Sequence, residues 1–134
     1  MPNVLIVDDD TDLLNGQKVF LQEHGYTVET ATSMEGGLER LQSFTPDIIL
    51  ADLMMEHYDT GFVFCKRIKD IPEMREVPII MQTSAPKQTG FTFDVSNPKT
   101  KKWIMVDEVI TKPFPLDQLL GRIERYLGKD QDNA

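Results

Sequence analysis

The stretch NVLIVDDDTDLL, residues 3–14, joins an apolar run to a cluster of acids. The apolar run, residues 4–7, shows no alternation of polar and apolar side chains, which is typical of a strand covered on both faces. Asp8, Asp9 and Asp10 follow it directly. Carboxylates that lie so close repel one another, and desolvation raises the free-energy cost of ionising each of them. We therefore expect a positive group near them in the folded chain.

Further along the chain, apolar runs alternate with segments of helical spacing. The expected strands are residues 4–7, 26–31, 47–51, 77–83 and 108–112. The expected helices are residues 12–24, 32–44, 61–71 and 116–127. This alternation predicts an α/β fold with a parallel sheet and helices on both of its faces. Residues 84–107 show no helical period and predict an irregular connection, a feature that is uncommon in compact domains and often functional.

Local signals predict the helix ends and the helix faces that meet the core. Asp10 or Thr11 is expected to cap the first helix, which ends before Gly25. The pattern T-x-x-E at residues 32–35 predicts a capping box at the start of the second helix. The side chains expected to face the core are Leu13, Gly16, Phe20, Leu21, Met34, Leu38, Leu41, Phe44, Phe64, Cys65, Ile68, Leu116, Leu119, Leu120, Ile123 and Leu127.

Composition and charge exclude several classes of function. The chain has 134 residues, of which 40% are hydrophobic and 27% charged, as expected for one soluble globular domain. Its net charge of −8 argues against nonspecific nucleic-acid binding and against docking on an anionic membrane. No apolar run approaches the roughly 18 residues of a membrane span, and the N-terminus lacks the features of a signal peptide. The single cysteine, Cys65, cannot form an internal disulfide, so a cytoplasmic location is expected.

Polar side chains gather where the expected strands end. Ligands of parallel α/β sheets lie at the carboxyl ends of the strands. The residues at these ends are Asp8 and Asp9, Asp52, Thr83 with Ser84, and Lys112 with Pro113. A hard divalent cation with oxygen ligands, with Mg²⁺ as the expected ion, would relieve the repulsion between the acids. The lysine and the hydroxyl group would then face phosphoryl oxygens as a positive charge and a hydrogen-bond donor.

This set of residues resembles the receiver domain of response regulators, the CheY-like family. The matching fragments are VLIVDDD (4–10), PDIILADLMM (46–55), DTG (59–61), VPIIMQTSA (77–85) and ITKPF (110–114). The resemblance implies a flavodoxin-like, doubly wound, five-stranded parallel sheet with strand order 2-1-3-4-5. In this chain the fourth helix is expected to be irregular or shortened. Residues 1–128 are expected to form the receiver domain, and residues 129–134 a polar C-terminal tail.

The resemblance also implies roles for the acids of the site. Asp52 would be the phosphoacceptor, taking a phosphoryl group from the phosphohistidine of a sensor histidine kinase or a histidine phosphotransfer protein. Asp8, Asp9 and Asp52 would bind Mg²⁺ together with the backbone carbonyl of Met54. Mn²⁺ is the expected substitute for Mg²⁺ at these ligands.

Further residues are assigned to switching by the same resemblance. Thr83 and Lys112 would contact the bound phosphoryl group, and the peptide bond before Pro113 would be cis. The chain departs from the family at Glu56, where proline is frequent. The residues expected to modulate the site are Glu56, His57, Ser84 and Ala85.

The implied function is that of a single-domain response regulator in a two-component phosphorelay. Such a phosphoprotein turns over no outside substrate and catalyses only its own aspartyl phosphorylation and dephosphorylation. It would act on an unknown downstream protein, as a monomer or weak dimer, without binding nucleic acid or membrane.

Two alternatives stay open. The first is a pseudo-receiver, which keeps the fold as a phosphorylation-independent interaction module. The second is a Mg²⁺-dependent phosphohydrolase of the haloacid-dehalogenase kind, which has a D-x-D-x-[TV] pattern after its first strand. Asp12 stands where that pattern needs threonine or valine, and Asp52 would have no role in such an enzyme.

Overall fold

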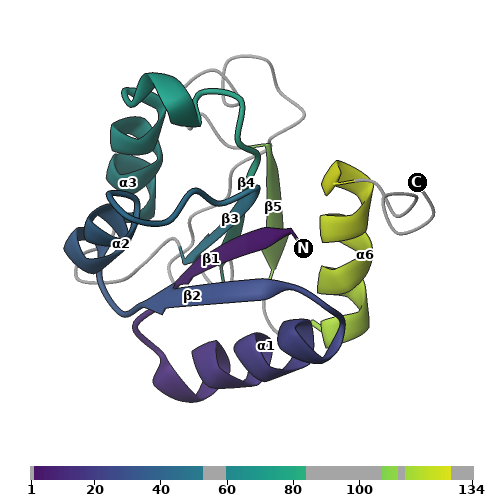
Figure 1. Cartoon of the computed structure of the whole chain (residues 1–134). Helices are drawn as coiled ribbons and strands as arrows, with labels where there is room; N and C mark the ends of the chain where they lie inside the picture. Colours follow the sequence, from purple (N-terminus) through teal and green to yellow (C-terminus); the bar gives the residue numbers. More distant parts are fainter. Residues whose placement is uncertain (1, 53–59, 84–106, 112–113, 128–134) are drawn as a thin grey trace.

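Five parallel strands form one sheet in the order β2-β1-β3-β4-β5 (Figure 1), which confirms the expected strand order. The strands are β1 (Asn3–Val7), β2 (Thr27–Ala31), β3 (Ile48–Asp52), β4 (Ile79–Thr83) and β5 (Glu108–Thr111). The computed structural model describes residues 2–52, 60–83, 107–111 and 114–127. The tail expected at 129–134 and, apart from Asp107, the connection expected at 84–107 lie outside these ranges.

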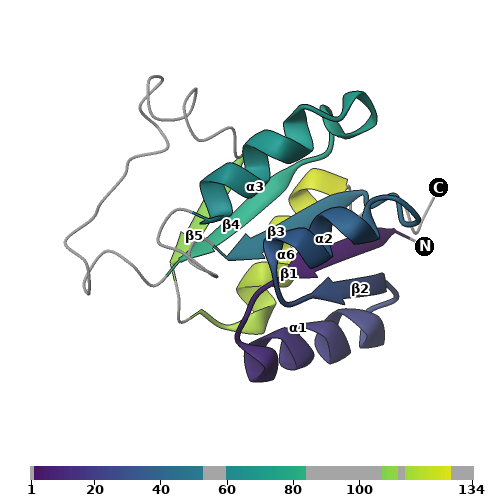
Figure 2. The ribbon, with the colours of Figure 1, turned by 90° about the vertical axis from the view of Figure 1, so that its left-hand side faces the viewer.

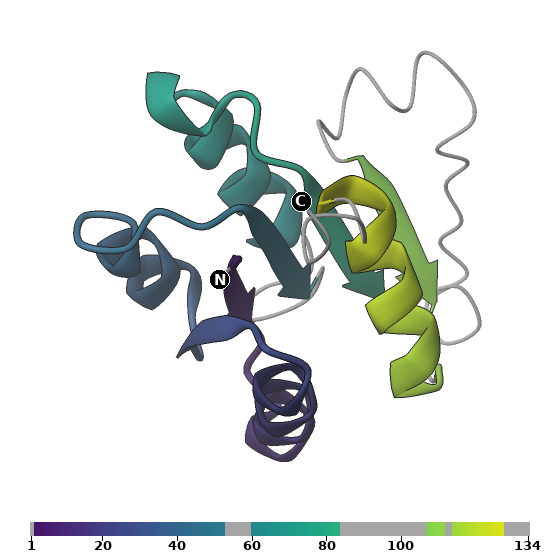
Figure 3. The ribbon, with the colours of Figure 1, turned by 45° about the vertical axis from the view of Figure 1, so that its right-hand side comes forward.

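Helices cover both faces of the sheet, as expected for a doubly wound fold. The helices are α1 (Thr11–Glu23), α2 (Met34–Arg40), α3 (Thr60–Lys69), the short 3₁₀ helix η1 (Pro72–Met74) and α6 (Leu116–Leu127). Helices α2 and α3 lie together on one face (Figure 2), and α1 and α6 lie on the opposite face (Figure 3). Among the described residues, no helix combines the length and the apolar character needed to cross a membrane.

The strands supply two core layers, one on each face of the sheet. In β1, Leu5 and Val7 pack toward α2 and α3, whereas Val4 and Ile6 pack toward α1 and α6. None of these side chains is more than 1% exposed. Both faces of β1 are therefore buried, which explains why its sequence shows no alternation.

The predicted inward face of α3 is confirmed. Phe64, Cys65 and Ile68 are all fully buried in the layer that α2 and α3 share. Burial raises the pKa of the Cys65 thiol to about 12. Because the thiolate is the reactive form of cysteine, Cys65 is an inert core side chain at neutral pH.

The predicted core face of α1 is confirmed at Leu21, which is buried, and at Phe20, which packs against the core, but it is wrong at Leu13 and Gly16. The buried side chains of α1 are Leu14, Gln17 and Leu21, while Leu13 is half-buried and Gly16 is exposed. The inward stripe thus contains a glutamine, which a reading of apolar spacing passes over. The N-cap is confirmed as Asp10, whose Oδ1 accepts a hydrogen bond from the Leu13 backbone N–H at 3.2 Å.

The predicted capping box of α2 is also wrong. The N-cap is Ser33, whose Oγ accepts a hydrogen bond from the Gly36 backbone N–H at 3.0 Å. The helix ends at Arg40, short of the expected end at Phe44. Leu41 and Phe44 still pack against the core from the turn that follows, so apolar spacing alone did not mark the helix end.

The corrected cap gives a matched pair of variants. Ser33→Ala removes the acceptor for the Gly36 N–H and should lower the free energy of unfolding by about 1 kcal/mol. Thr32→Ala, at an exposed position just outside the helix, should change it by less than about 0.5 kcal/mol. Urea denaturation of both variants measures the difference. A larger loss of unfolding free energy for Thr32→Ala than for Ser33→Ala would show that Thr32, and with it the capping box, caps α2 after all.

Helices α2 and α3 approach each other closely at Gly37. A Cβ atom built on Gly37 would lie 2.8 Å from Cζ of Phe64 and 2.9 Å from Cγ2 of Val7. Both contacts are shorter than packed carbon atoms allow, so only glycine fits here without rearrangement. Gly37 thus sets how near α2 lies to α3 and β1.

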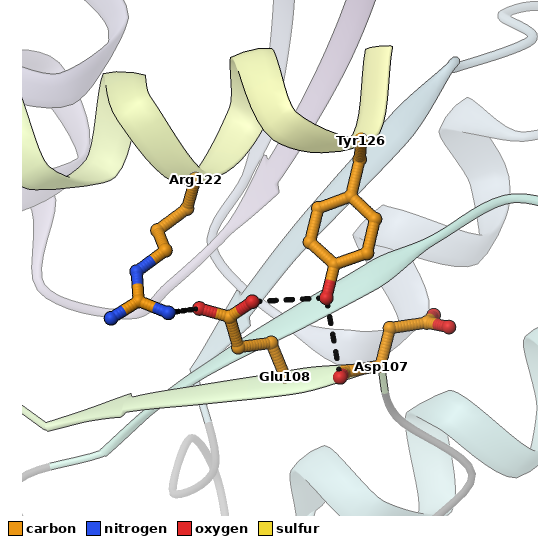
Figure 4. A network of polar contacts seen from close by, with 4 residues as sticks. All are labelled: Asp107, Glu108, Arg122 and Tyr126. Carbon is orange, nitrogen blue, oxygen red and sulfur yellow. Dashed lines mark hydrogen bonds and ion pairs between the residues drawn. The ribbon is translucent and has the colours of Figure 1, made fainter. Parts of the chain in front are cut away.

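A polar network joins the start of β5 to α6 (Figure 4). The Tyr126 hydroxyl lies 2.9 Å from Oε1 of Glu108 and 3.2 Å from the carbonyl oxygen of Asp107, and Arg122 pairs with the other oxygen of Glu108. Burial, with a contribution from the hydrogen bond to Glu108, raises the pKa of Tyr126 to about 12. The phenol is thus a protonated donor at neutral pH. Asp107 also binds the first residue of β4, since its Oδ2 accepts from the Ile79 N–H at 2.8 Å.

Candidate phosphoryl and metal site

Three carboxylates converge at the carboxyl edge of the sheet, as the sequence predicted. Asp8 and Asp9 follow β1, and Asp52 is the last residue of β3. One carboxylate oxygen from each lies within 4.8 Å of the others. The three differ in access to solvent, because Asp8 is 1% exposed, Asp52 is 8% exposed and Asp9 is exposed. A buried acid, a nearly buried acid and an exposed acid therefore share one small volume.

The local backbone explains why Asp8 turns inward. Its N–H donates to the carbonyl oxygen of Ala31 at 3.1 Å, which extends the pairing of β1 with β2 by one residue. Its Oδ1 accepts a hydrogen bond from the Asp10 N–H at 2.9 Å. Asp10 in turn caps α1. The hydrogen bonds in the turn from β1 to α1 are thus made by the acids themselves, and they hold Asp8 next to the N-cap of the helix.

Strand β4 brings a hydroxyl group to the same edge. Thr83 is the last residue of β4 and is 2% exposed. The register pairs Asp52 of β3 with Gln82, and pairs Thr83 with Thr111 of β5. The strand ends that carry Asp52 and Thr83 are therefore neighbours in the sheet.

The other predicted site residues fall outside the described ranges. They are Met54, Glu56, His57, Ser84, Ala85, Lys112 and Pro113. Their expected roles stay predictions. Thr111, the residue before Lys112, is placed in β5 beside Thr83.

The donor set fits the predicted cation. Carboxylate oxygens are the ligands that Mg²⁺ and Mn²⁺ prefer in proteins. Asp8, Asp9 and Asp52 offer such oxygens within 4.8 Å of one another, a spacing that suits an ion bound between them directly or through water molecules. The geometry therefore suits a hard divalent cation, whose charge would offset the repulsion between these acids.

The sequence reading missed a polar pair beside this site. Gln82 is the register partner of Asp52, and its side chain amide exchanges two hydrogen bonds with that of Gln17 on α1. Its only sequence signal is a polar residue directly after the apolar residues Ile79–Met81 of the strand IIMQT.

Comparison with known proteins agrees with this geometry. The family model described as response regulator receiver domain matches residues 4–124. The heme response regulator HssR of Staphylococcus epidermidis is 35% identical over 135 aligned residues, which cover 100% of this chain and 55% of that protein. The chain spans about half the length of the curated relatives it matches.

Solved structures resemble the whole fold. The chemotaxis response regulator CheY4 of Vibrio cholerae has a TM-score of 0.79 at 28% identity, over 94% of this chain and 98% of that one. A putative response regulator from Chloroflexus aurantiacus has a TM-score of 0.77 at 28% identity, over 96% of this chain and 100% of that one.

Proposed function

This chain belongs to the response regulator receiver domain family, and we propose that it works as a phosphorylation-dependent switch. Asp52 would accept a phosphoryl group from the phosphohistidine of a sensor histidine kinase or a histidine phosphotransfer protein. The modified chain would then bind a downstream protein differently. The observation that carries this proposal is the meeting of Asp52 with Asp8 and Asp9 at one strand edge, with Thr83 on the next strand.

The transfer step follows from the chemistry of Asp52. One of its carboxylate oxygens attacks the phosphorus atom and forms an acyl phosphate, while the bond from phosphorus to the donor's imidazole nitrogen breaks. The electron pair of that bond stays on the imidazole. Because Asp52 is only 8% exposed, few water molecules compete with the donor for the phosphoryl group.

The neighbouring side chains would stabilise the negative charge of the phosphoryl group. Asp8, Asp9 and Asp52, with the Met54 carbonyl, would hold Mg²⁺, which when bound neutralises charge on the phosphoryl oxygens. The Thr83 hydroxyl would donate a hydrogen bond to one of these oxygens, and Lys112 would pair with another. Movement of Thr83 toward the phosphoryl group would report phosphorylation to the rest of the chain.

Acetyl phosphate tests the proposal without a partner protein. Incubated with acetyl phosphate and Mg²⁺, the chain should gain the mass of one phosphoryl group, and peptide mapping should place it on Asp52. Omission of Mg²⁺ with added EDTA should prevent the gain, because the acids would then repel the anionic donor. Intact-mass spectrometry measures both outcomes. A correctly folded chain that gains no mass would favour the pseudo-receiver alternative.

A further inference from the structure

Two glutamine side chains are paired inside the apolar layer between the sheet and helices α1 and α6. Nε2 of Gln17 donates to Oε1 of Gln82 at 3.0 Å, and Nε2 of Gln82 donates to Oε1 of Gln17 at 3.2 Å. Gln17 is fully buried and Gln82 is 1% exposed. Each amide thus satisfies one donor and one acceptor of the other, in a layer whose buried hydrophobic side chains, such as Leu14 and Ile80, are all aliphatic.

The pair connects the two parts of the phosphoryl site. Gln82 is the register partner of Asp52, so their side chains leave neighbouring strands toward the same face of the sheet. The next residue of β4 is Thr83. Gln17 belongs to α1, the helix that begins directly after Asp8 and Asp9. The two hydrogen bonds therefore join the helix that follows the acids to the strand end that carries the hydroxyl.

Stability alone does not explain a buried amide pair. Replacing both partners of a buried hydrogen bond by apolar groups of similar shape is nearly neutral, whereas removing one partner leaves the other unsatisfied. What two opposed hydrogen bonds add over apolar packing is direction, because they fix the lateral position of one element against the other. Here the fixed elements are α1 and the end of β4.

We propose that Gln17 and Gln82 are positioning residues of the phosphoryl site, which hold the end of β4 so that the Thr83 hydroxyl meets the phosphoryl group on Asp52. This inference rests on the proposed function. The pair acts through Thr83 and touches no reacting atom. Mg²⁺ affinity should not depend on it, since Asp8, Asp9 and Asp52 are held by β1 and β3.

Methionine variants separate positioning from stability. Gln17→Met and Gln82→Met should each lower the thermal midpoint by about 5–10 °C, because each leaves one buried amide unsatisfied. The double variant should recover more than half of this loss, since both amides are then absent. Because the double variant is then nearly as stable as the wild type, the phosphorylation rates of the two proteins can be compared directly.

The decisive readout is the rate of phosphorylation by acetyl phosphate at saturating Mg²⁺, followed by intact mass. The double methionine variant should react about fivefold more slowly than the wild type, while its half-saturating Mg²⁺ concentration changes less than about twofold. When the same two substitutions are combined with Thr83→Ala, they should not lower the rate below that of Thr83→Ala alone, because the hydroxyl that they would misplace is already absent. Ile123→Val, in the same core layer but on α6, should lower the midpoint and leave the rate unchanged.

The outcomes distinguish the two proposals. A double variant that reacts at the wild-type rate, or that slows Thr83→Ala further, overturns the positioning role and leaves the proposed function standing. A wild-type chain that takes no phosphoryl group overturns the proposed function and the positioning role together. Both proposals are supported if the two methionine substitutions slow phosphorylation of the wild type but not of Thr83→Ala, and if Mg²⁺ affinity is unchanged.

Discussion

Asp52→Asn should abolish phosphoryl uptake and at the same time raise the stability of the metal-free chain. The amide cannot attack phosphorus as a carboxylate does, so no adduct should form with acetyl phosphate and Mg²⁺. The same change removes one of three carboxylates whose oxygens lie within 4.8 Å of one another. The loss of this repulsion should raise the free energy of unfolding in EDTA by about 1 kcal/mol. Intact mass and urea denaturation measure the two effects.

Asp12→Asn is the matched control for this experiment. Asp12 is an exposed acid on the first turn of α1, outside the acid cluster, so its substitution removes the same charge. The control should be phosphorylated like the wild type and should gain no stability. Mg²⁺ should raise the thermal midpoint of the wild type more than that of Asp52→Asn, because the variant has lost a ligand. An adduct that persists on Asp52→Asn at the wild-type level would mean that another residue is the acceptor.

Phe64→Ala should cause the largest loss of stability, about 4 kcal/mol, because it empties a fully buried aromatic position between α2, α3 and the sheet. Gly37→Ala should lower the free energy of unfolding by about 2 kcal/mol, although alanine favours helix by about 1 kcal/mol. The reason is the distance of 2.8 Å that its Cβ would have to Cζ of Phe64. Urea denaturation measures each loss.

The two substitutions should compensate each other in part. Removing the ring of Phe64 makes room for the new Cβ, so the double variant should be at least about 1 kcal/mol more stable than the sum of the single losses predicts. Gly16→Ala is the control, since a Cβ there meets nothing within 4 Å and should raise stability by about 0.5–1 kcal/mol. Strictly additive losses for Gly37→Ala and Phe64→Ala would contradict a direct contact.

The sheet and its acid cluster could be predicted because both depend on short-range patterns. A strand buried on both faces has a continuous apolar run, and the residue after it falls at the carboxyl edge of the sheet. Asp8, Asp9, Asp52 and Thr83 are all placed by this rule alone, and the structure brings the three acids together as expected.

One failure arose where a polar side chain has its hydrogen-bond partner far along the chain. Gln17 lies in the core because Gln82, 65 residues away, satisfies its amide, and no local pattern contains that information. The cap of α2 failed for a different reason. Thr32 and Ser33 are adjacent residues of similar capping preference, and only the backbone decides which hydroxyl reaches an N–H of the first turn.

The strand order also bears on how each molecule is made. Strands β1, β2 and β3 are adjacent in the sheet and end by Asp52, and β4 and then β5 join one edge in the order of their synthesis. No later strand has to enter between two earlier ones. Since ribosomes add about 5–20 residues per second and N-terminal parts fold first, the sheet can grow outward as the chain emerges. The strands that carry the acids of the site therefore leave the ribosome before the strand that carries the Thr83 hydroxyl.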